Sequence, residues 1–340
     1  MQVTLKIQRY NPETETGGVE TYTVDAAEEA TLLDVLDVIK DEVDGSLSYR
    51  KSCRMAVCGS CGMRMDGAAV LACKTPVKPL VDEGHVPVIS PMGNLPVIKD
   101  LVVDMGPFWE KFRAIKPYLD DTDSDPPVKE WRVQQEELDQ IMKEALCIQC
   151  GCCVSECNSM EADPDFLGPA ALAKAARFVY DVRDRGGKSR LELVNGQHGV
   201  WDCTRCYFCQ ERCPKGVDPR DAIAKVGARI YQEGMHGDRG ARHAKVFVKS
   251  TYKTGYLLET NLVPETVGAL AAIKEIPFAM KMVRAGKVPN PLKPHKAGKL
   301  DEVRRLNTLV GEQEKQALEA VHRGPAWPAE DAPPPPEDDE

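Results

Sequence analysis

The sequence lacks an uncharged apolar run long enough to span a bilayer, which takes about 20 residues. The best candidate, residues 267–283, is interrupted by three charged residues and by Pro277. The chain also lacks an excess of basic residues, because its net charge is −9, so it has no electrostatic footprint for nucleic acid. These absences predict a soluble chain that binds no nucleic acid and can dock beneath a membrane.

No basic and apolar signal sequence and no twin-arginine motif precede the first strand-like segment. We therefore expect a reducing cytoplasm, where disulfides are rare. This expectation matters because the chain contains 13 cysteines. In a reducing compartment, a dense cysteine pattern indicates metal binding rather than disulfide bonds.

Twelve of the cysteines form three groups. The first group reads C-x4-C-x2-C with a distant fourth cysteine, which is the plant-type [2Fe-2S] ferredoxin pattern. The second and third groups both read C-x2-C-x2-C-x3-C, which is the bacterial pattern for cubane clusters. The groups are Cys53, Cys58, Cys61 and Cys73; then Cys147, Cys150, Cys153 and Cys157; then Cys203, Cys206, Cys209 and Cys213, followed by Pro214.

The spacing also predicts which cysteines share a cluster. A tight loop can reach three corners of a cubane, whereas the fourth cysteine of such a run ligates the other cluster of the pair. In the first group, Gly59 and Gly62 have no Cβ, so the backbone can approach the cluster and point N–H groups at its sulfurs. We assign Cys147, Cys150, Cys153 and Cys213 to one [4Fe-4S] cluster, and Cys157, Cys203, Cys206 and Cys209 to a second.

Other interpretations of these residues are weaker. Zinc favours two separated C-x2-C pairs that make one tetrahedral site, and each run here is too dense for that. The thirteenth cysteine, Cys152, is expected to be a spare buried thiol. We expect no acid–base catalytic residue on this chain, because all six histidines lie outside the cysteine runs. They are His85, His198, His236, His243, His295 and His322.

Hydrophobic periodicity predicts an α+β fold. Strands at residues 2–10 and 21–24, a helix over 32–43 and a hairpin turning at Asp66-Gly67 predict a β-grasp [2Fe-2S] ferredoxin domain. Later helices are expected at residues 169–180, 241–258 and 303–321. We expect these parts: 1–104, the β-grasp domain; 105–133, a linker; 134–235, an α-helical domain with two cubane-type clusters; 236–323, a helical C-terminal extension; and 324–340, a disordered, acidic, proline-rich tail.

Four motifs are informative beyond the cysteine spacing. They are SCRMAVCGSCGM at Ser52–Met63, CIQCGCCVSEC at Cys147–Cys157, DFLGPAAL at Asp165–Leu172 and CPKG at Cys213–Gly216. On these motifs the chain, over about residues 1–232, resembles the iron–sulfur subunit of succinate dehydrogenase and fumarate reductase. The resemblance implies a subunit that relays single electrons between the FAD of a flavoprotein subunit and either a quinone pool or a partner with CCG domains. It also implies a peripheral position on the cytoplasmic side of the plasma membrane, held by partner subunits.

Two departures from the common pattern of this family concern the third cysteine group. Members of the family usually have valine or isoleucine at the position of Cys206, and their third cluster is [3Fe-4S]. Because Cys206 adds a fourth thiolate, we expect a second [4Fe-4S] cluster here. A [3Fe-4S] cluster bound without Cys206 is the alternative. Ala162 and Thr204 replace the tryptophan and histidine of the usual quinone pocket, so contact with quinone is expected to be indirect. Both departures resemble the unconventional branch of the family, which passes electrons to a partner with CCG domains rather than to a haem-bearing membrane anchor. The expected acceptor is therefore a CCG-domain or membrane-anchor subunit. Residues 240–320 also resemble the C-terminal part of a heterodisulfide reductase C-type subunit.

Two other functions remain open. The chain can be the iron–sulfur subunit of a thiol:fumarate or heterodisulfide-type reductase, because a shared fold does not fix the reaction. It can also be a standalone polyferredoxin carrier. Stable binding to a larger flavoprotein would distinguish a subunit of a complex from such a carrier. The direction of the reaction does not follow from the sequence, because reduction potential depends on cluster environment as well as on ligand type.

Overall fold

A computed structural model describes residues 1–120, 131, 133–235, 237–287 and 295–323. The chain divides into two compact units, which are described separately below. The first unit comprises Met1–Tyr118, Asp139–Phe178 and Cys203–Ile223, and it contains every cysteine. Residues 121–130 of the predicted linker and the predicted tail at 324–340 lie outside the described residues.

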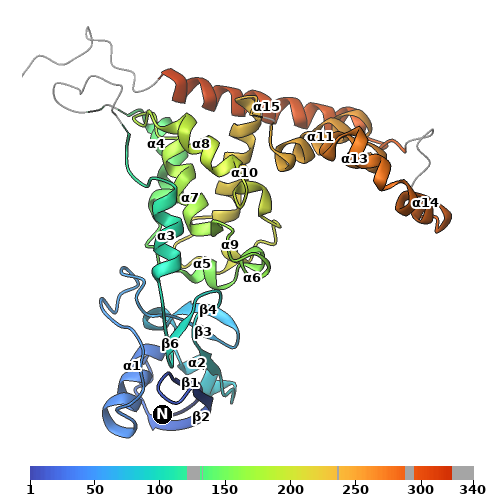
Figure 1. Cartoon of the computed structure of the whole chain (residues 1–340). Helices are drawn as coiled ribbons and strands as arrows, with labels where there is room; N and C mark the ends of the chain where they lie inside the picture. Colours follow the sequence, from blue (N-terminus) through green and yellow to red (C-terminus); the bar gives the residue numbers. More distant parts are fainter. Residues whose placement is uncertain (121–130, 132, 236, 288–294, 324–340) are drawn as a thin grey trace, which may run out of the picture. The chain divides into compact units, whose positions relative to one another are not determined.

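The first unit begins with a mixed five-stranded sheet (Figure 1). Its strands lie in the order β2-β1-β5-β3-β4. β1 is antiparallel to β2, with Leu5 opposite Tyr22, and parallel to β5, which is antiparallel to β3. A separate two-stranded sheet pairs β6 with β7. The bounds are β1 (Gln2–Asn11), β2 (Thr16–Asp25), β3 (Gly62–Met65), β4 (Ala68–Leu71), β5 (Val88–Ser90), β6 (Val97–Lys99) and β7 (Val102–Val103).

The core of this domain forms between the apolar face of β1 and the apolar face of helix α1 (Leu32–Val38). Alternate residues of β1 point inward, and one face of α1 supplies the other apolar side chains. Thr31 begins α1 with a capping box, because its hydroxyl accepts from the Asp34 N–H and Asp34 accepts from the Thr31 N–H. The helix continues as a single π-helical segment, η1 (Ile39–Val43). The core residues include Val3, Leu5, Ile7, Leu32, Leu33, Leu36, Ile39, Met63 and Ile89.

The predicted hairpin is confirmed as β3 and β4, joined at Asp66 and Gly67. Both turn residues have positive φ, 52° and 78°, as a two-residue hairpin turn requires. The sequence did not predict β5, which has three residues and lies between β1 and β3. With the helices that follow, the sheet confirms the predicted α+β fold.

The rest of the first unit is helical, and its longest helices frame the cysteine loops. In α7 (Gly168–Val179), Pro169 occupies the first turn and a buried alanine-rich face follows, so the backbone of other segments can approach closely. The other helices with residues in this unit are η2 (Ala72–Lys74), α2 (Lys78–Asp82), α3 (Gly106–Ala114), α4 (Gln135–Ala145), α5 (Cys152–Ser155), α6 (Asn158–Ala162), α9 (Phe208–Glu211) and α10 (Pro219–Gln232).

Helices are the only regular elements among the described residues of the second unit, and the Trp201 side chain packs beside two of its glycines. A Cβ at Gly227 would lie 3.6 Å from the Trp201 ring, and a Cβ at Gly240 would lie 2.2 Å from the Trp201 Cβ. The predicted C-terminal helices are confirmed as α11 and α15, which contact each other (Figure 1). The bounds are α8 (Gly187–Asn195), η3 (Val200–Asp202), α11 (Arg239–Thr254), α12 (Glu259–Val267), α13 (Ala269–Lys274), α14 (Ile276–Arg284) and α15 (Leu300–Arg323).

Within the part of the chain that the structure describes, no helix is both long enough and apolar enough to cross a bilayer. The segment 267–283, the best candidate in the sequence, is divided between the end of α12, α13 and α14.

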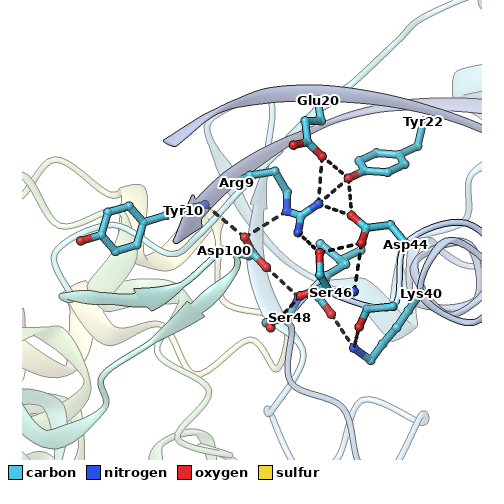
Figure 2. A network of polar contacts seen from close by, with 11 residues as sticks. Arg9, Tyr10, Glu20, Tyr22, Lys40, Asp44, Ser46, Ser48 and Asp100 are labelled. Atoms are coloured by element: carbon cyan, nitrogen blue, oxygen red, sulfur yellow. Dashed lines mark hydrogen bonds and ion pairs between the residues drawn. The ribbon is translucent and has the colours of Figure 1, made fainter. Parts of the chain in front are cut away.

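An arginine on β1 joins four segments of the N-terminal sheet domain (Figure 2). Arg9 is largely buried, and its Nε donates to Asp100 Oδ1 at 3.0 Å while its Nη2 donates to Ser46 Oγ at 2.9 Å. Asp100 also accepts from the N–H groups of Tyr10 and Ser48, at 3.1 and 2.9 Å. Although burial opposes its charge, hydrogen bonds with Asp100 and Asp44 raise the pKa of Arg9. The remaining partners of Arg9 are Glu20, at 2.9 Å, Tyr22 and Asp44.

We expect Arg9→Met to lower the free energy of unfolding of this domain by about 3 kcal/mol, because the buried Asp100 carboxylate would lose its cation. The urea midpoint of the visible circular dichroism signal from the first cysteine group measures this change. Lys78→Met is the control: its ion pair with Glu28 is exposed and screened by solvent, so we expect a much smaller shift of the midpoint. Equal midpoints for the two variants would contradict this role of Arg9.

Candidate iron–sulfur sites

The first site consists of Cys53, Cys58, Cys61 and Cys73. The loop from Cys53 to Cys61 lies between η1 and β3, and Cys73 lies in η2 directly after β4. The Sγ atoms of Cys61 and Cys73 are 3.3 Å apart, and both side chains are buried. Cys58 is exposed, so the site opens to solvent on the side of the loop.

Backbone amides of the loop point at the sulfurs of the first site. Three N–H groups donate to Cys53 Sγ or Cys73 Sγ at 3.2–3.3 Å: those of Ala56, Val57 and Cys58. The left-handed conformation of Ala56, at φ 56°, helps to turn the chain in this way. Amide donors of this kind stabilise negatively charged sulfur, so the loop fits a [2Fe-2S] cluster.

Helix α1 fixes the same loop through Asp37. The Asp37 carboxylate accepts from Lys51 Nζ at 2.8 Å and from Tyr49 and Arg54. Burial opposes the charge of Asp37, yet hydrogen bonds from Lys51 and Tyr49 lower its pKa. This carboxylate therefore ties the start of the cysteine loop to the core helix.

The second site is a cavity lined by Cys147, Cys150, Cys153 and Cys213. These are the four cysteines that the spacing assigned to one cubane, and they come from two loops more than 50 residues apart in the sequence. The other lining residues are mostly apolar and include Ile148, Ala170, Ala173, Pro214, Val217 and Pro219.

The third site is a cavity lined by Cys157, Cys203, Cys206 and Cys209. Ser159 and Thr204 also line it, and Ser159 Oγ accepts from the Thr204 N–H at 3.2 Å. The structure therefore brings together each predicted set of four cysteines, with Cys206 in the third. Their role as iron ligands stays a prediction.

The loops of the second and third sites share a backbone conformation. In one, Gln149 and Gly151 flank the second cysteine with φ values of 58° and 81°. In the other, Arg205 and Tyr207 hold the matching positions with φ values of 57° and 69°. The internal repeat seen in the sequence is therefore a repeat of structure, even though tyrosine replaces glycine at the last position.

Burial and hydrogen bonding shift the pKa values of several cysteine thiols in opposite directions. It raises the pKa of Cys153, and it raises the pKa of Cys209 to about 12. A hydrogen bond with the fully buried Cys152 lowers the pKa of Cys150 to about 7, and one with Ser60 lowers that of Cys58 to about 6. A thiol that coordinates a metal ion is deprotonated outright. Four sulfurs facing one apolar cavity therefore fit a cubane cluster, whose iron would compensate the buried negative charge.

The sequence did not reveal the residues that hold α5, the short helix between the second and third sites. Arg64 Nε donates to Ser155 Oγ at 3.0 Å and to Glu156 Oε1 at 2.8 Å. Asn94 Nδ2 donates to the carbonyls of Val154 and Cys157 at 2.8 and 3.0 Å. Neither residue lies in a motif, and only their tertiary contacts identify them as supports of the sites.

We expect Asn94→Asp to speed the release of iron from the third site to a chelator on the order of tenfold, because two carbonyls at α5 would lose their donor. Aspartate keeps the size of the side chain and tolerates the positive φ of 59° at this position. Asn11→Asp is the control, since Asn11 is exposed and its side-chain oxygen accepts from the Glu13 N–H at 2.9 Å, a bond that a carboxylate oxygen accepts as well. Equal release rates in the two variants would show that Asn94 does not support the site.

Comparison with known proteins agrees with this arrangement. Residues 4–110 match the 2Fe-2S iron–sulfur cluster binding domain, and residues 145–217 match the 4Fe-4S dicluster domain. The class of protein is therefore a multi-cluster iron–sulfur protein.

Among the relatives, the fumarate reductase iron–sulfur subunit of Haemophilus influenzae is 43% identical over 231 residues, covering 64% of this chain and 89% of the relative. The 8-methylmenaquinol:fumarate reductase iron–sulfur subunit of Wolinella succinogenes is 35% identical over 291 residues, covering 84% and 90%. A chain of the Mycobacterium smegmatis Sdh1 complex in the apo form has a TM-score of 0.63 and 25% identity, covering 69% and 97%. The chain belongs to the family of iron–sulfur subunits of succinate dehydrogenase and fumarate reductase.

Proposed function

We propose that this chain relays single electrons between the FAD of a flavoprotein subunit and an acceptor on another partner, within a succinate dehydrogenase or fumarate reductase complex. The observation that carries this proposal is the presence of three four-cysteine sites in one compact unit. Iron–sulfur clusters bound there would take up and release one electron at a time. The chain itself holds the sulfurs, orients amides toward those of the first site and keeps water from the buried cysteines.

The first site has the properties of the end that faces the flavoprotein. Cys58 is exposed, and the apolar side chains of Met55 and Val57 are 71% and 56% exposed beside it. Apolar side chains around an exposed redox site suit a protein–protein contact that brings another cofactor close.

The third site has the properties of the opposite end. The residues from Thr204 to Phe208 are all exposed, including Cys206, and the Arg220 guanidinium lies 4.4 Å from the centre of the Tyr207 ring. Exposed aromatic and arginine side chains are typical of interface cores. Thr204 and Ala162 leave no tryptophan–histidine pair for quinone, so we infer a protein-bound acceptor such as a CCG-domain subunit.

This assignment implies a peripheral protein on the cytoplasmic side of the plasma membrane, attached through its partner subunits. The Wolinella succinogenes relative is named for 8-methylmenaquinol and fumarate. We infer that quinone would be reached only indirectly, through the acceptor subunit.

We propose that Cys206 completes a second [4Fe-4S] cluster with Cys157, Cys203 and Cys209. Cys206→Val should convert this cluster to [3Fe-4S], because one iron corner would lose its thiolate. Low-temperature EPR of the oxidised protein detects the conversion as a new [3Fe-4S] signal. If anaerobically prepared wild type already showed that signal as its dominant species, the ligand role of Cys206 would be wrong.

The function is tested by purifying the complex from its own cells and adding succinate under anaerobic conditions. We expect a larger flavoprotein to remain bound to the chain. Succinate should reduce the clusters only while this flavoprotein is bound. A chain that purified alone would support the standalone carrier. Oxidation of the reduced complex by a disulfide, and not by a quinone analogue, would support the thiol-linked reductase.

A further inference from the structure

The loops of the first and second sites touch at two glycines. A Cβ at Gly59 would lie 2.7 Å from the Cys150 Cβ and 2.8 Å from its Cα. A Cβ at Gly62 would lie 3.2 Å from the Cys150 carbonyl oxygen. Real side chains do not tolerate the first two distances, so only glycine at position 59 allows this approach.

Met92 packs against both loops beside this contact. It is buried, and its thioether sulfur would lie 3.0 Å from a Cβ at Gly62 and 3.6 Å from a Cβ at Gly151. The loops are therefore packed together through glycine backbone on both sides of one methionine. A side chain at Gly59 would push the first loop away from Cys150, whereas one at Gly62 would require only a small shift of Met92 and the Cys150 carbonyl.

The contact has a direct meaning for electron transfer. Gly59 follows Cys58, a predicted ligand of the first site, and it touches Cys150, a predicted ligand of the second. A path between the sites can thus run along covalent bonds except for one van der Waals step. Electron tunnelling weakens steeply with distance, and a through-space step weakens it more than a bond does.

We propose that Gly59 is a positioning residue for electron transfer, which sets the separation and coupling between the clusters of the first and second sites, with Gly62 as a second contact. This inference rests on the proposed function, because it needs iron bound at both sites. It goes further, because it assigns the coupling to one glycine–cysteine contact.

The test compares Gly59→Ala with Gly67→Ala in the full chain with its clusters. Both glycines have positive φ, 73° and 78°, but nothing lies within 4 Å of a Cβ at Gly67. The two substitutions thus share the backbone strain, and only one meets Cys150. One measurement is the electron-transfer rate between the two clusters after flash photoreduction; the other is the EPR spin relaxation of the reduced first cluster with the second oxidised or reduced.

We expect Gly59→Ala to slow the transfer several-fold and to weaken the relaxation enhancement, with iron content and the spectrum of the first cluster retained. Gly67→Ala should match wild type in both. If the Gly59→Ala variant loses its first cluster, the same two measurements on Gly62→Ala test the proposal. The backbone of Gly62 is not in the left-handed region, and a Cβ there would require only a small shift of its neighbours. Unchanged rate and relaxation in the variant that keeps its iron would overturn the proposal. Absence of iron from wild type would instead refute the proposed function.

Discussion

The architecture depends on holding groups of four cysteine sulfurs together, with most of them partly or wholly shielded from water. Burial raises the pKa of thiols such as Cys153 and Cys209, because an uncompensated thiolate is costly away from water. Iron would supply the compensating charge. The mostly apolar lining of the second site is then an advantage, since it limits the access of water to a cluster bound there.

This constraint explains why the sheet domain and the cysteine-rich helices belong to one compact unit. Helix α5 carries Cys153 and leads into Cys157, so it serves the second and third sites at once. Arg64, from the sheet, and Asn94, from the loop after it, hold this helix through its backbone and Ser155. Residues of the first ferredoxin-like part therefore set the geometry of sites whose ligands lie far along the chain.

Much of this was predictable because cysteine spacing and strand periodicity are local signals. The grouping of Cys213 with Cys147, and of Cys157 with Cys203, follows from the reach of a tight loop around a cubane. The turn at Asp66-Gly67 was predictable because both residues must adopt positive φ. The roles of Asn94, Met92 and the strand β5 were not, because each is defined by a tertiary contact that leaves no periodic pattern in the sequence.

The central claim is that twelve cysteines hold iron at three sites. Metal analysis of the chain, purified without oxygen from its native complex, tests this claim most directly. The account predicts about ten iron atoms per polypeptide, with acid-labile sulfide and no stoichiometric zinc. Colourless protein, or zinc bound in place of the iron, would contradict it.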